Sequence, residues 1–178
     1  MAGTYPEFSS ARLRLRRPKA GDAPRLAELA ADYDVTRMTG RMPHPYTLQD
    51  ATDFIERVCA RGPGEDPTFL LECEEGPAGV LGFFTPEGVW SLYGPEIGYW
   101  IGRPFWGRGY ASEAVGAALG WAERDWRKHL IVAGHFSDNP ASGRVLEKAG
   151  FLYTGVVEPC FSLARGETAA SRRMVRLA

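Results

Sequence analysis

Apolar residues recur every three or four positions in four stretches of the chain, which is the spacing of one face of a helix. The first stretch follows Asp22 and Pro24, residue types that favour the first turn of a helix. The last stretch ends at Gly150, where a left-handed helix cap is expected. The pattern therefore predicts four helices, over residues 22–33, 51–58, 111–122 and 139–150.

Short apolar runs bounded by Gly, Pro and Glu lie before, between and after these helices, and they predict strands. The chain order is then one strand, two helices, three strands, a helix, a strand, a helix and two strands. That order indicates a mixed α/β sheet in which strand–helix–strand crossovers occur only in the second half. The seven predicted strands are Leu13–Arg16, Thr68–Cys73, Gly79–Phe84, Glu96–Gly102, His129–Phe136, Phe151–Val157 and Ser171–Ala178.

The size of the chain changes this picture little. With 178 residues and 19.6 kDa it corresponds to one domain over residues 1–178, and a chain of this length buries a substantial core. Hydrophobic residues make up 44% and charged residues 24%. These values exclude a disordered, collagenous or disulfide-stapled protein.

Charge is nearly balanced, with 21 Lys and Arg against 22 Asp and Glu. Bulk charge therefore gives no reason to expect a nucleic acid or an anionic membrane as partner. A local basic run does occur near the start, where Arg12, Arg14 and Arg16 alternate with Leu13 and Leu15. We interpret it as the solvated face of a strand whose other face is apolar.

Cysteine and histidine usage argues against a metal centre. Cys59, Cys73 and Cys160 are far apart and form no C-x-x-C pair, and the three histidines lack the spacing of a zinc site. An odd, sparse set of cysteines is typical of a reducing compartment. No run approaches eighteen apolar residues, and the first residues contain no apolar signal segment. We therefore expect a soluble, cytoplasmic protein without a metal.

The segment Ile101–Ala114 carries the first chemical signal. A strand ends there, a glycine-rich turn follows, and a helix begins at once. Gly107 and Gly109 permit backbone conformations in which several N–H groups point the same way. A helix N-terminus adds unpaired N–H groups, so the whole suits a pyrophosphate. Alternatively, a glycine-rich turn can simply connect a strand to a helix without binding a ligand. The sequence contains neither a P-loop motif nor a complete dinucleotide-binding fingerprint.

The segment Ser137–Phe151 carries the second signal. Asn139 is placed to cap a helix that has Pro140 in its first turn. Ser142 then shares one helix face with Val145 and Leu146. A hydroxyl on an apolar face is available for chemistry, and the alternative is a hydroxyl bonded to its own backbone.

Glu96 is the candidate general base. Strand alternation places Glu96, Gly98 and Trp100 on one face. A carboxylate on a central strand beside Trp100 is partly desolvated, which favours proton uptake. The alternative is a structural carboxylate that is paired with one of the arginines.

These segments together resemble a known family. WGRGYASEA and SDNPASGRVLEKAGF are similar to the acetyl-CoA motif and the following helix motif of the GNAT acetyltransferases, in particular the branch that acetylates ribosomal-protein N-termini. LRLRR, MPHPYT and EIGYWI extend the resemblance over nearly the whole chain. One departure from the wider superfamily is Trp106, where many members have Gln or Arg, although an aromatic residue is usual in this branch.

The resemblance implies a twisted mixed sheet of about seven strands, split in a V between the fourth and fifth, with about four helices. It implies acetyl-CoA as co-substrate, with pantetheine bonded to backbone near Trp100, Ile101 and Gly102. Asn139 and Ser142 would approach the thiol end. The pyrophosphate would lie on Trp106, Gly107, Arg108, Gly109, Tyr110 and Ala111.

The implied reaction is direct transfer of acetyl to a primary amine in a ternary complex, with Glu96 as base and Ser142 protonating the departing thiolate. The acceptor, a protein N-terminus or a small molecule, is left open, as is the choice between monomer and homodimer. The loop Thr39–Thr47 and the last two strands are expected on the acceptor side. Thr85–Pro95 resembles an insertion that adds a wall, a dimer contact or core. A module that binds CoA or a peptide without catalysis is the alternative function.

Overall fold

The computed structural model describes residues 5–62, 64–86 and 88–177, and within them one sheet runs through the molecule. The predicted order of elements is confirmed. The strands are β1 (Phe8–Ser9), β2 (Arg14–Arg16), β3 (Thr68–Cys73), β4 (Gly76–Phe84), β5 (Glu96–Ile101), β6 (Leu130–Phe136), β7 (Leu152–Ser162) and β8 (Glu167–Leu177). The helices are α1 (Ala23–Ala30), α2 (Tyr33–Thr36), α3 (Leu48–Ala60), α4 (Tyr110–Arg124) and α5 (Pro140–Lys148), with short 3₁₀ turns η1 (Ala20–Asp22), η2 (Gly88–Leu92) and η3 (Arg103–Phe105).

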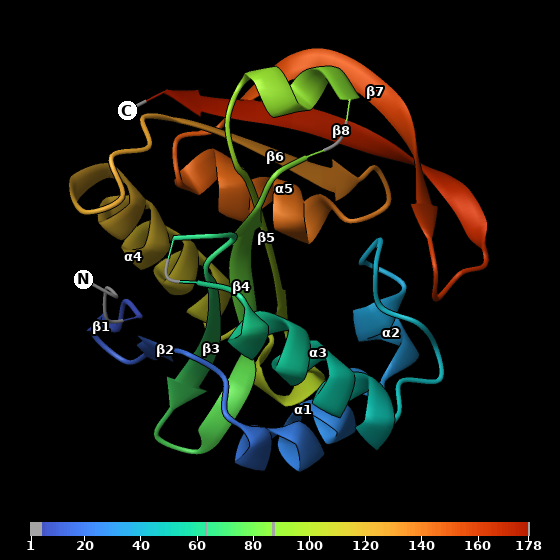
Figure 1. The fold of residues 1–178 in the computed structure, drawn as a ribbon. Coiled ribbons are helices and arrows are strands. Elements are labelled where there is room, and N and C mark those ends of the chain that lie inside the picture. Colours follow the sequence, from blue (N-terminus) through green and yellow to red (C-terminus); the bar gives the residue numbers. More distant parts are fainter. Residues whose placement is uncertain (1–4, 63, 87, 178) are drawn as a thin grey trace.

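The strands are ordered β1-β2-β3-β4-β5-β6-β8-β7. Neighbouring strands are antiparallel except β5 and β6, which are parallel and pair only at Glu96–Val132 and Ile97–Ala133. In Figure 1 the strands β3, β4 and β5 run steeply, whereas β6, β8 and β7 cross above them. The sheet is therefore split in a V between β5 and β6.

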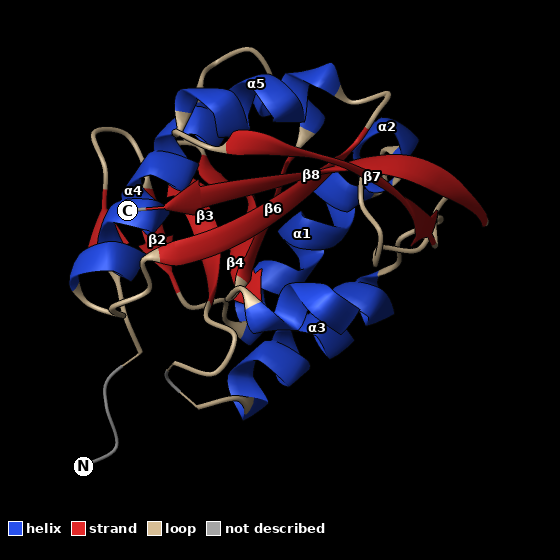
Figure 2. Cartoon of the chain, turned by 90° about the horizontal axis from the view of Figure 1, so that it is seen from above, coloured by secondary structure: helices blue, strands red, loops and turns tan. Residues whose placement is uncertain are grey.

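Helices cover both faces of the sheet (Figure 2), and this explains the two hydrophobic cores. The larger core lies between the sheet and α4 and α5, and it includes Phe69, Phe83 and Trp121. The smaller one joins α1 and α3 to Leu70 and Val80 on the opposite face. A core on each face fixes β4 in the middle of the domain, and β5 beside it buries Ile97 and Ile101 in the larger core.

Two elements were not predicted, so the described chain has eight strands and five α-helices where about seven and about four were expected. Strand β1 is two residues long and α2 is four, too short for a periodic pattern to register. The helix predicted over residues 22–33 ends at Ala30, and Asp32 caps the separate α2 by accepting a hydrogen bond from the Asp34 amide.

The prediction that Arg16 lies on a solvated face is wrong. Its side chain is buried, and its guanidinium donates to both oxygens of Asp22 at 2.8 and 2.9 Å and to Glu72 at 2.7 Å. Asp22 stands at the predicted helix start but makes no side-chain cap bond to α1. Its carboxylate instead binds Arg16 and accepts from the Lys19 amide. The ion pair therefore fastens the start of α1 to β2 and β3.

Replacing Asp22 with Ala should lower the free energy of unfolding by about 3 kcal/mol, because the buried Arg16 loses its buried carboxylate partner and keeps only the half-buried Glu72. Burial pushes the pKa of Asp22 upward, but the hydrogen bonds from Arg16 and the Lys19 amide outweigh it and lower the pKa overall. The stabilisation is thus complete above the unfolded value of about 4 and is lost as pH falls through the lower folded pKa. Urea unfolding of both proteins at pH 7 and pH 3 measures this difference.

Glu28→Ala is the matched control, since Glu28 pairs with Arg25 on an exposed face of the same helix. It should cost no more than about 0.5 kcal/mol. Equal losses in the two variants, or a loss for Asp22→Ala that does not shrink at pH 3, would contradict the buried ion pair.

Candidate functional site

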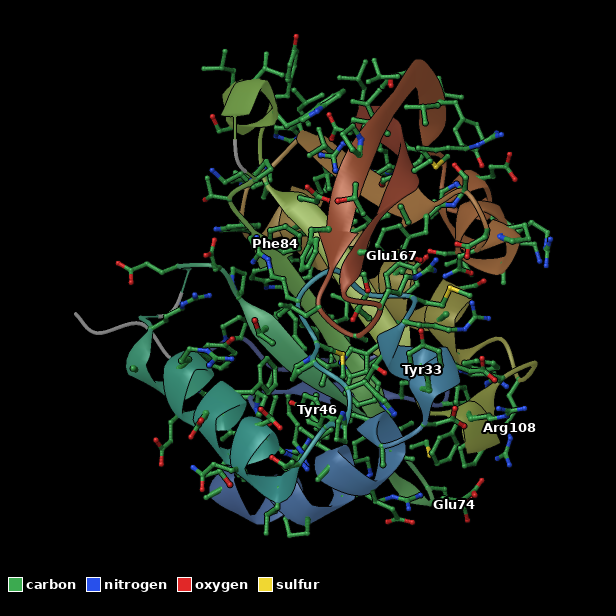
Figure 3. The ribbon with its side chains drawn as sticks, turned by 90° about the vertical axis from the view of Figure 1, so that its right-hand side faces the viewer. Tyr33, Tyr46, Glu74, Phe84, Arg108 and Glu167 are labelled. Atoms are coloured by element: carbon green, nitrogen blue, oxygen red, sulfur yellow. The ribbon has the colours of Figure 1, made fainter. Side chains whose placement is uncertain are left out.

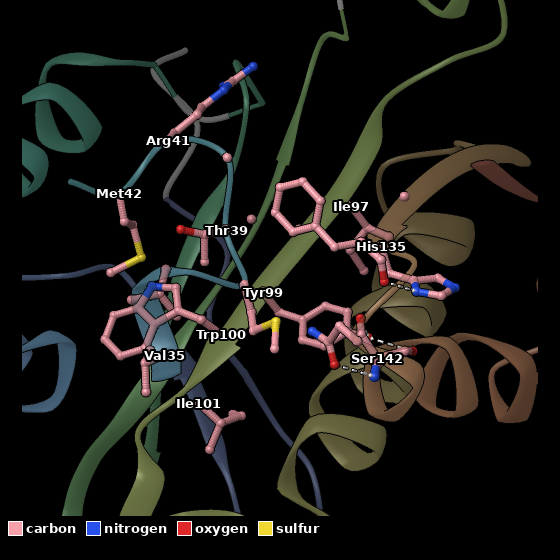
Figure 4. A pocket seen from close by; sticks show the side chains of 18 of the residues that line it. Val35, Thr39, Arg41, Met42, Ile97, Tyr99, Trp100, Ile101, His135 and Ser142 are labelled. Atoms are coloured by element: carbon pink, nitrogen blue, oxygen red, sulfur yellow. Dashed lines mark hydrogen bonds between the residues drawn. The ribbon is translucent and has the colours of Figure 1, made fainter. Parts of the chain in front are cut away.

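The V between β5 and β6 opens into a cavity of 1470 Å³. Its walls come from β4 and β5, from the first turns of α4 and α5, from residues 34–43 and from the β7–β8 hairpin. Figure 4 shows Trp100 with Met42 and Val35 on one side of β5, and Tyr99 with Ser142 and His135 on the other. The opening brings together the two segments that the sequence analysis singled out.

Along β5, the backbone N–H and C=O groups of successive residues point alternately toward β4 and toward the opening. The Gly102 amide donates to Ala78 O at 2.8 Å, on the β4 side. Because an antiparallel ladder has a period of two, Trp100 also directs its backbone toward β4, whereas Tyr99 and Ile101 direct theirs toward the opening. Three residues were expected to bond pantetheine through their backbone. The backbone groups of Trp100 and Gly102 are already engaged with β4, and only those of Ile101 face the V. Its carbonyl accepts from Trp106 Nε1 at 2.7 Å.

Both glycines of the glycine-rich turn have left-handed backbone geometry, a conformation that other residues rarely adopt. Gly107 has φ 75° and Gly109 has φ 80°, and Gly109 is the N-cap of α4 without any side-chain cap bond. The first amides of a helix have no partner inside it. Those of Tyr110, Ala111 and Ser112 therefore remain directed out of the helix end. Together with the positive end of the helix dipole, they form a site that suits an anion.

Arg12 lies against this turn, which the sequence analysis did not foresee. Its Nε donates to Glu113 at 2.8 Å, its Nη1 donates to Arg108 O at 3.0 Å, and its guanidinium lies 4.9 Å from the centre of the Tyr110 ring. Arg108 itself points outward and pairs with Glu75. Arg12 therefore holds the turn in place through Arg108 and Glu113. Because Glu113 is 101 positions away in the chain, no local sequence pattern predicts this contact.

Helix α5 begins as predicted. Asn139 caps it by accepting from the Ser142 amide at 3.2 Å, with Pro140 in the first turn. The Ser142 hydroxyl is not bonded to its own backbone. It lies 2.9 Å from the Tyr99 hydroxyl, which is also 3.2 Å from the Ser142 carbonyl oxygen. Burial raises the pKa of Tyr99 to about 12, although the bond with Ser142 acts in the other direction.

Glu96 lines the cavity and is paired with an arginine. Arg173 donates to both Glu96 oxygens at 2.9 Å, and both side chains are largely buried. On its other side Arg173 approaches Glu158 at 3.2 Å. The arginine partner weighed for Glu96 in the sequence is therefore present, on β8, and the carboxylate still faces the cavity.

Trp90 completes this cluster from the segment Thr85–Pro95. Its Nε1 donates to Glu158 at 3.0 Å, and the Arg173 guanidinium lies 4.7 Å from its ring centre. Val89 and Leu92 beside it are exposed. The described residues Gly88–Leu92 therefore form a wall over the ion pair, and none of them is buried in the core.

The far side of the cavity is closed by a bridge across the V. Figure 3 shows the β7–β8 hairpin, marked by Glu167, bending toward α2, marked by Tyr33. The Leu163 amide donates to Gly40 O at 3.1 Å, and Arg165 Nε donates to Arg37 O at 2.6 Å. Arg165 also binds both oxygens of Asp138 and so lowers the pKa of that carboxyl.

Cys160 lies on the same hairpin and lines the cavity beside Glu96 and Arg173. Burial, reinforced by the negative charge of Glu96, raises the pKa of its thiol. A thiol of this kind is a poor nucleophile, because only the thiolate reacts.

Within residues 5–62, 64–86 and 88–177, no cluster of three or more His, Cys, Asp or Glu side chains is arranged to hold a metal ion. Over the same residues, no helix combines the length and the apolar character that a membrane crossing requires.

Comparison with known proteins places the chain among acetyltransferases. Among curated relatives, the uncharacterized N-acetyltransferase p20 of Bacillus licheniformis is 26% identical over 82% of each chain. The [ribosomal protein uS5]-alanine N-acetyltransferase of Escherichia coli is 30% identical over 46% of this chain and 49% of its own.

Solved structures share the fold over nearly the whole chain. A GNAT-family acetyltransferase from Bacillus anthracis superposes with a TM-score of 0.80 at 24% identity, covering 96% of this chain and 98% of its own. RimL, a ribosomal L7/L12 alpha-N-protein acetyltransferase solved with coenzyme A, gives 0.80 at 22% identity, with coverage of 94% and 95%. Residues 12–152 match the family model described as an acetyltransferase (GNAT) domain. The chain therefore belongs to the GNAT acetyltransferase family and is an acyltransferase of the N-acetyltransferase class.

Proposed function

We propose that the protein transfers the acetyl group of acetyl-CoA directly to a primary amine while both substrates are bound. The observation that carries this proposal is the alignment of three features along one opening. These are the β5 backbone at Tyr99 and Ile101, the uncapped start of α4, and the Ser142 hydroxyl at the start of α5. They suit three parts of acetyl-CoA: the β5 backbone suits the amide-bearing pantetheine arm, the start of α4 suits the pyrophosphate, and Ser142 suits the thioester.

In this proposal pantetheine lies beside β5 as an added strand and bonds to the backbone of Tyr99 and Ile101. Trp106 keeps its bond to the Ile101 carbonyl, which has a second lone pair for the cofactor. The pyrophosphate lies on the turn Trp106–Ala111, where backbone N–H groups supply the donors. Arg12 adds a positive charge beneath them, partly balanced by Glu113.

Asn139 and Ser142 lie at the thioester end of this path. The Asn139 oxygen is engaged in capping α5, so its NH₂ group is the part that remains to donate into the cavity. Ser142 presents its hydroxyl to the same space and donates to the departing sulfur.

Glu96 takes up the proton that the amine loses, through a water molecule in the cavity. Arg173 uses one lone pair of each Glu96 oxygen, and a carboxylate has about four acceptor positions, so two remain for water. The pair also fixes the direction of the carboxylate, as a general base requires.

The amine enters beside Thr39–Thr47 and the β7–β8 hairpin, which form the wall opposite the cofactor. Relatives of this fold are described as acting on ribosomal proteins, and another was solved as a spermidine N-acetyltransferase with CoA and spermine. Both kinds of acceptor carry a primary amine, which is the acceptor chemistry proposed for this chain. Its three cysteines form no disulfide, which fits a cytoplasmic enzyme.

The test of the proposed function is release of free thiol from acetyl-CoA with a panel of amines, including an alanine-terminated peptide and spermidine, with the acetylated product identified by mass. Acetyl-CoA binding measured by calorimetry accompanies it. Binding without transfer to any amine would make the protein a cofactor-binding module, and absence of binding would contradict the proposal outright.

Gly109→Val should weaken acetyl-CoA binding by about 100-fold or more in the same calorimetry. A valine is strained at φ 80°, so the turn cannot keep its N–H groups aligned. Gly116→Val is the control. Gly116 lies on the exposed side of the same helix with open space around it, and its affinity should stay within about threefold of the parent. Similar losses in both variants would count against the turn as the binding site.

Glu96→Gln should lower kcat by about 100-fold. The rate should then follow only the ionisation of the amine itself, whose pKa is about 8 for an α-amine and about 10.4 for a lysine. The pH profile of kcat/KM should then rise with pH only as the amine loses its proton. Glu158→Gln is the matched control, because Glu158 touches the same arginine but does not line the cavity. If both variants lose equal activity and stability, Glu96 serves only the ion pair.

A further inference from the structure

We propose that Tyr99 is a positioning residue for the transfer step, a role that rests on the proposed function. Its hydroxyl donates to Ser142 Oγ and thereby directs the Ser142 hydrogen at the departing sulfur. The contact that carries this is the 2.9 Å approach of the two hydroxyl oxygens, which both line the cavity (Figure 4).

Two hydrogen-bond arrangements are possible at this contact. Tyr99 has one hydroxyl hydrogen and two acceptors in reach, the Ser142 carbonyl at 3.2 Å and Ser142 Oγ at 2.9 Å. When the hydrogen points at the carbonyl, Ser142 donates back to Tyr99 and is turned away from the cavity. When it points at Oγ, the Ser142 hydrogen is free to point into the cavity.

The second arrangement costs little. A carbonyl inside a helix accepts from the amide four residues later, so the Ser142 carbonyl keeps a partner in α5 when Tyr99 turns away from it. The shorter of the two distances also favours Oγ as acceptor. As charge collects on the sulfur, Ser142 becomes a better donor because its own oxygen receives a hydrogen bond.

Tyr99 itself keeps its proton throughout. The burial that raises its pKa to about 12 makes it a neutral donor over the whole range in which the amine reacts. The step balances without a proton from Tyr99. The N–C bond forms and the C–S bond breaks, and the sulfur takes the bonding electron pair. It accepts the hydrogen bond of Ser142 and then gains a proton from solvent. A thiolate whose acid has a pKa of about 8.5 needs an oriented donor more than a strong acid.

The surroundings hold both partners in place. Tyr99 packs against the larger core from β5. Helix α5 is fixed on its other side, where a Cβ on Gly143 would stand 2.7 Å from the Tyr153 hydroxyl and 2.9 Å from His135 Nε2. Because the helix is seated this closely, Ser142 has little freedom to move away from Tyr99.

The experiment compares Tyr99→Phe with Tyr153→Phe, each alone, and Tyr99→Phe again in a Ser142→Ala background. Both tyrosines place a hydroxyl beside α5, but the Tyr153 hydroxyl lies 3.1 Å from His135 Nε2, whereas the Tyr99 hydroxyl lies 2.9 Å from Ser142 Oγ. Loss of one oriented hydrogen bond should lower kcat of Tyr99→Phe by about tenfold. KM for acetyl-CoA should stay within about threefold, and Tyr153→Phe should keep the parental kcat.

In the Ser142→Ala background Tyr99→Phe should have no further effect on kcat, because the hydroxyl that it positions is gone. Thermal unfolding of each variant shows whether a change in kcat comes instead from loss of structure. Full kcat in Tyr99→Phe, or two losses that multiply in the double variant, would overturn the inference while leaving the proposed function intact. An inactive parent protein would instead contradict the proposed function.

Discussion

The end of the pairing between β5 and β6 is the constraint on which the rest of the site depends. β5 is paired with β4 from Glu96 to Ile101, and β6 is paired with β8 from Leu130 to Phe136. Each strand thus has one complete ladder, and the two meet over only two residues. Backbone N–H and C=O groups require partners. The part of β5 beyond Ile97 therefore presents backbone groups to whatever lies in the V, and an amide-bearing chain suits that edge.

The same topology sets both helix starts at the opening. α4 follows β5 and α5 follows β6, and because these two strands are parallel, both helices begin at the same end of the pair. One start is left without a side-chain cap, so its free N–H groups suit an anion, and the other is capped by Asn139 and carries Ser142. The uncapped helix start and the Ser142 hydroxyl are therefore both held at the opening by the fold itself.

The sequence predicted the features that are local in the chain. The order of elements, the glycine-rich turn, the Asn139 cap and the alternation around Glu96 all follow from spacing, and the structure confirms them. The features that the sequence did not predict depend on residues that are distant in the chain. Arg16 is buried because Asp22 and Glu72 surround it, and Arg12 braces a turn that lies about a hundred residues away. Tyr99 meets Ser142 across 43 positions. A periodic pattern predicts which face of an element is apolar, but it does not predict which polar group from a distant part of the chain will contact that element.

We propose that a CoA arm completes β5 at the residues that face the V. Amide hydrogen exchange, followed residue by residue with NMR while CoA is added, tests it most directly. The amides of Tyr99 and Ile101 should become protected when CoA binds. The amides of Trp100 and Gly102, which already face β4, should exchange slowly with or without CoA. Protection that appears elsewhere on the surface, with Tyr99 and Ile101 unchanged, would contradict it.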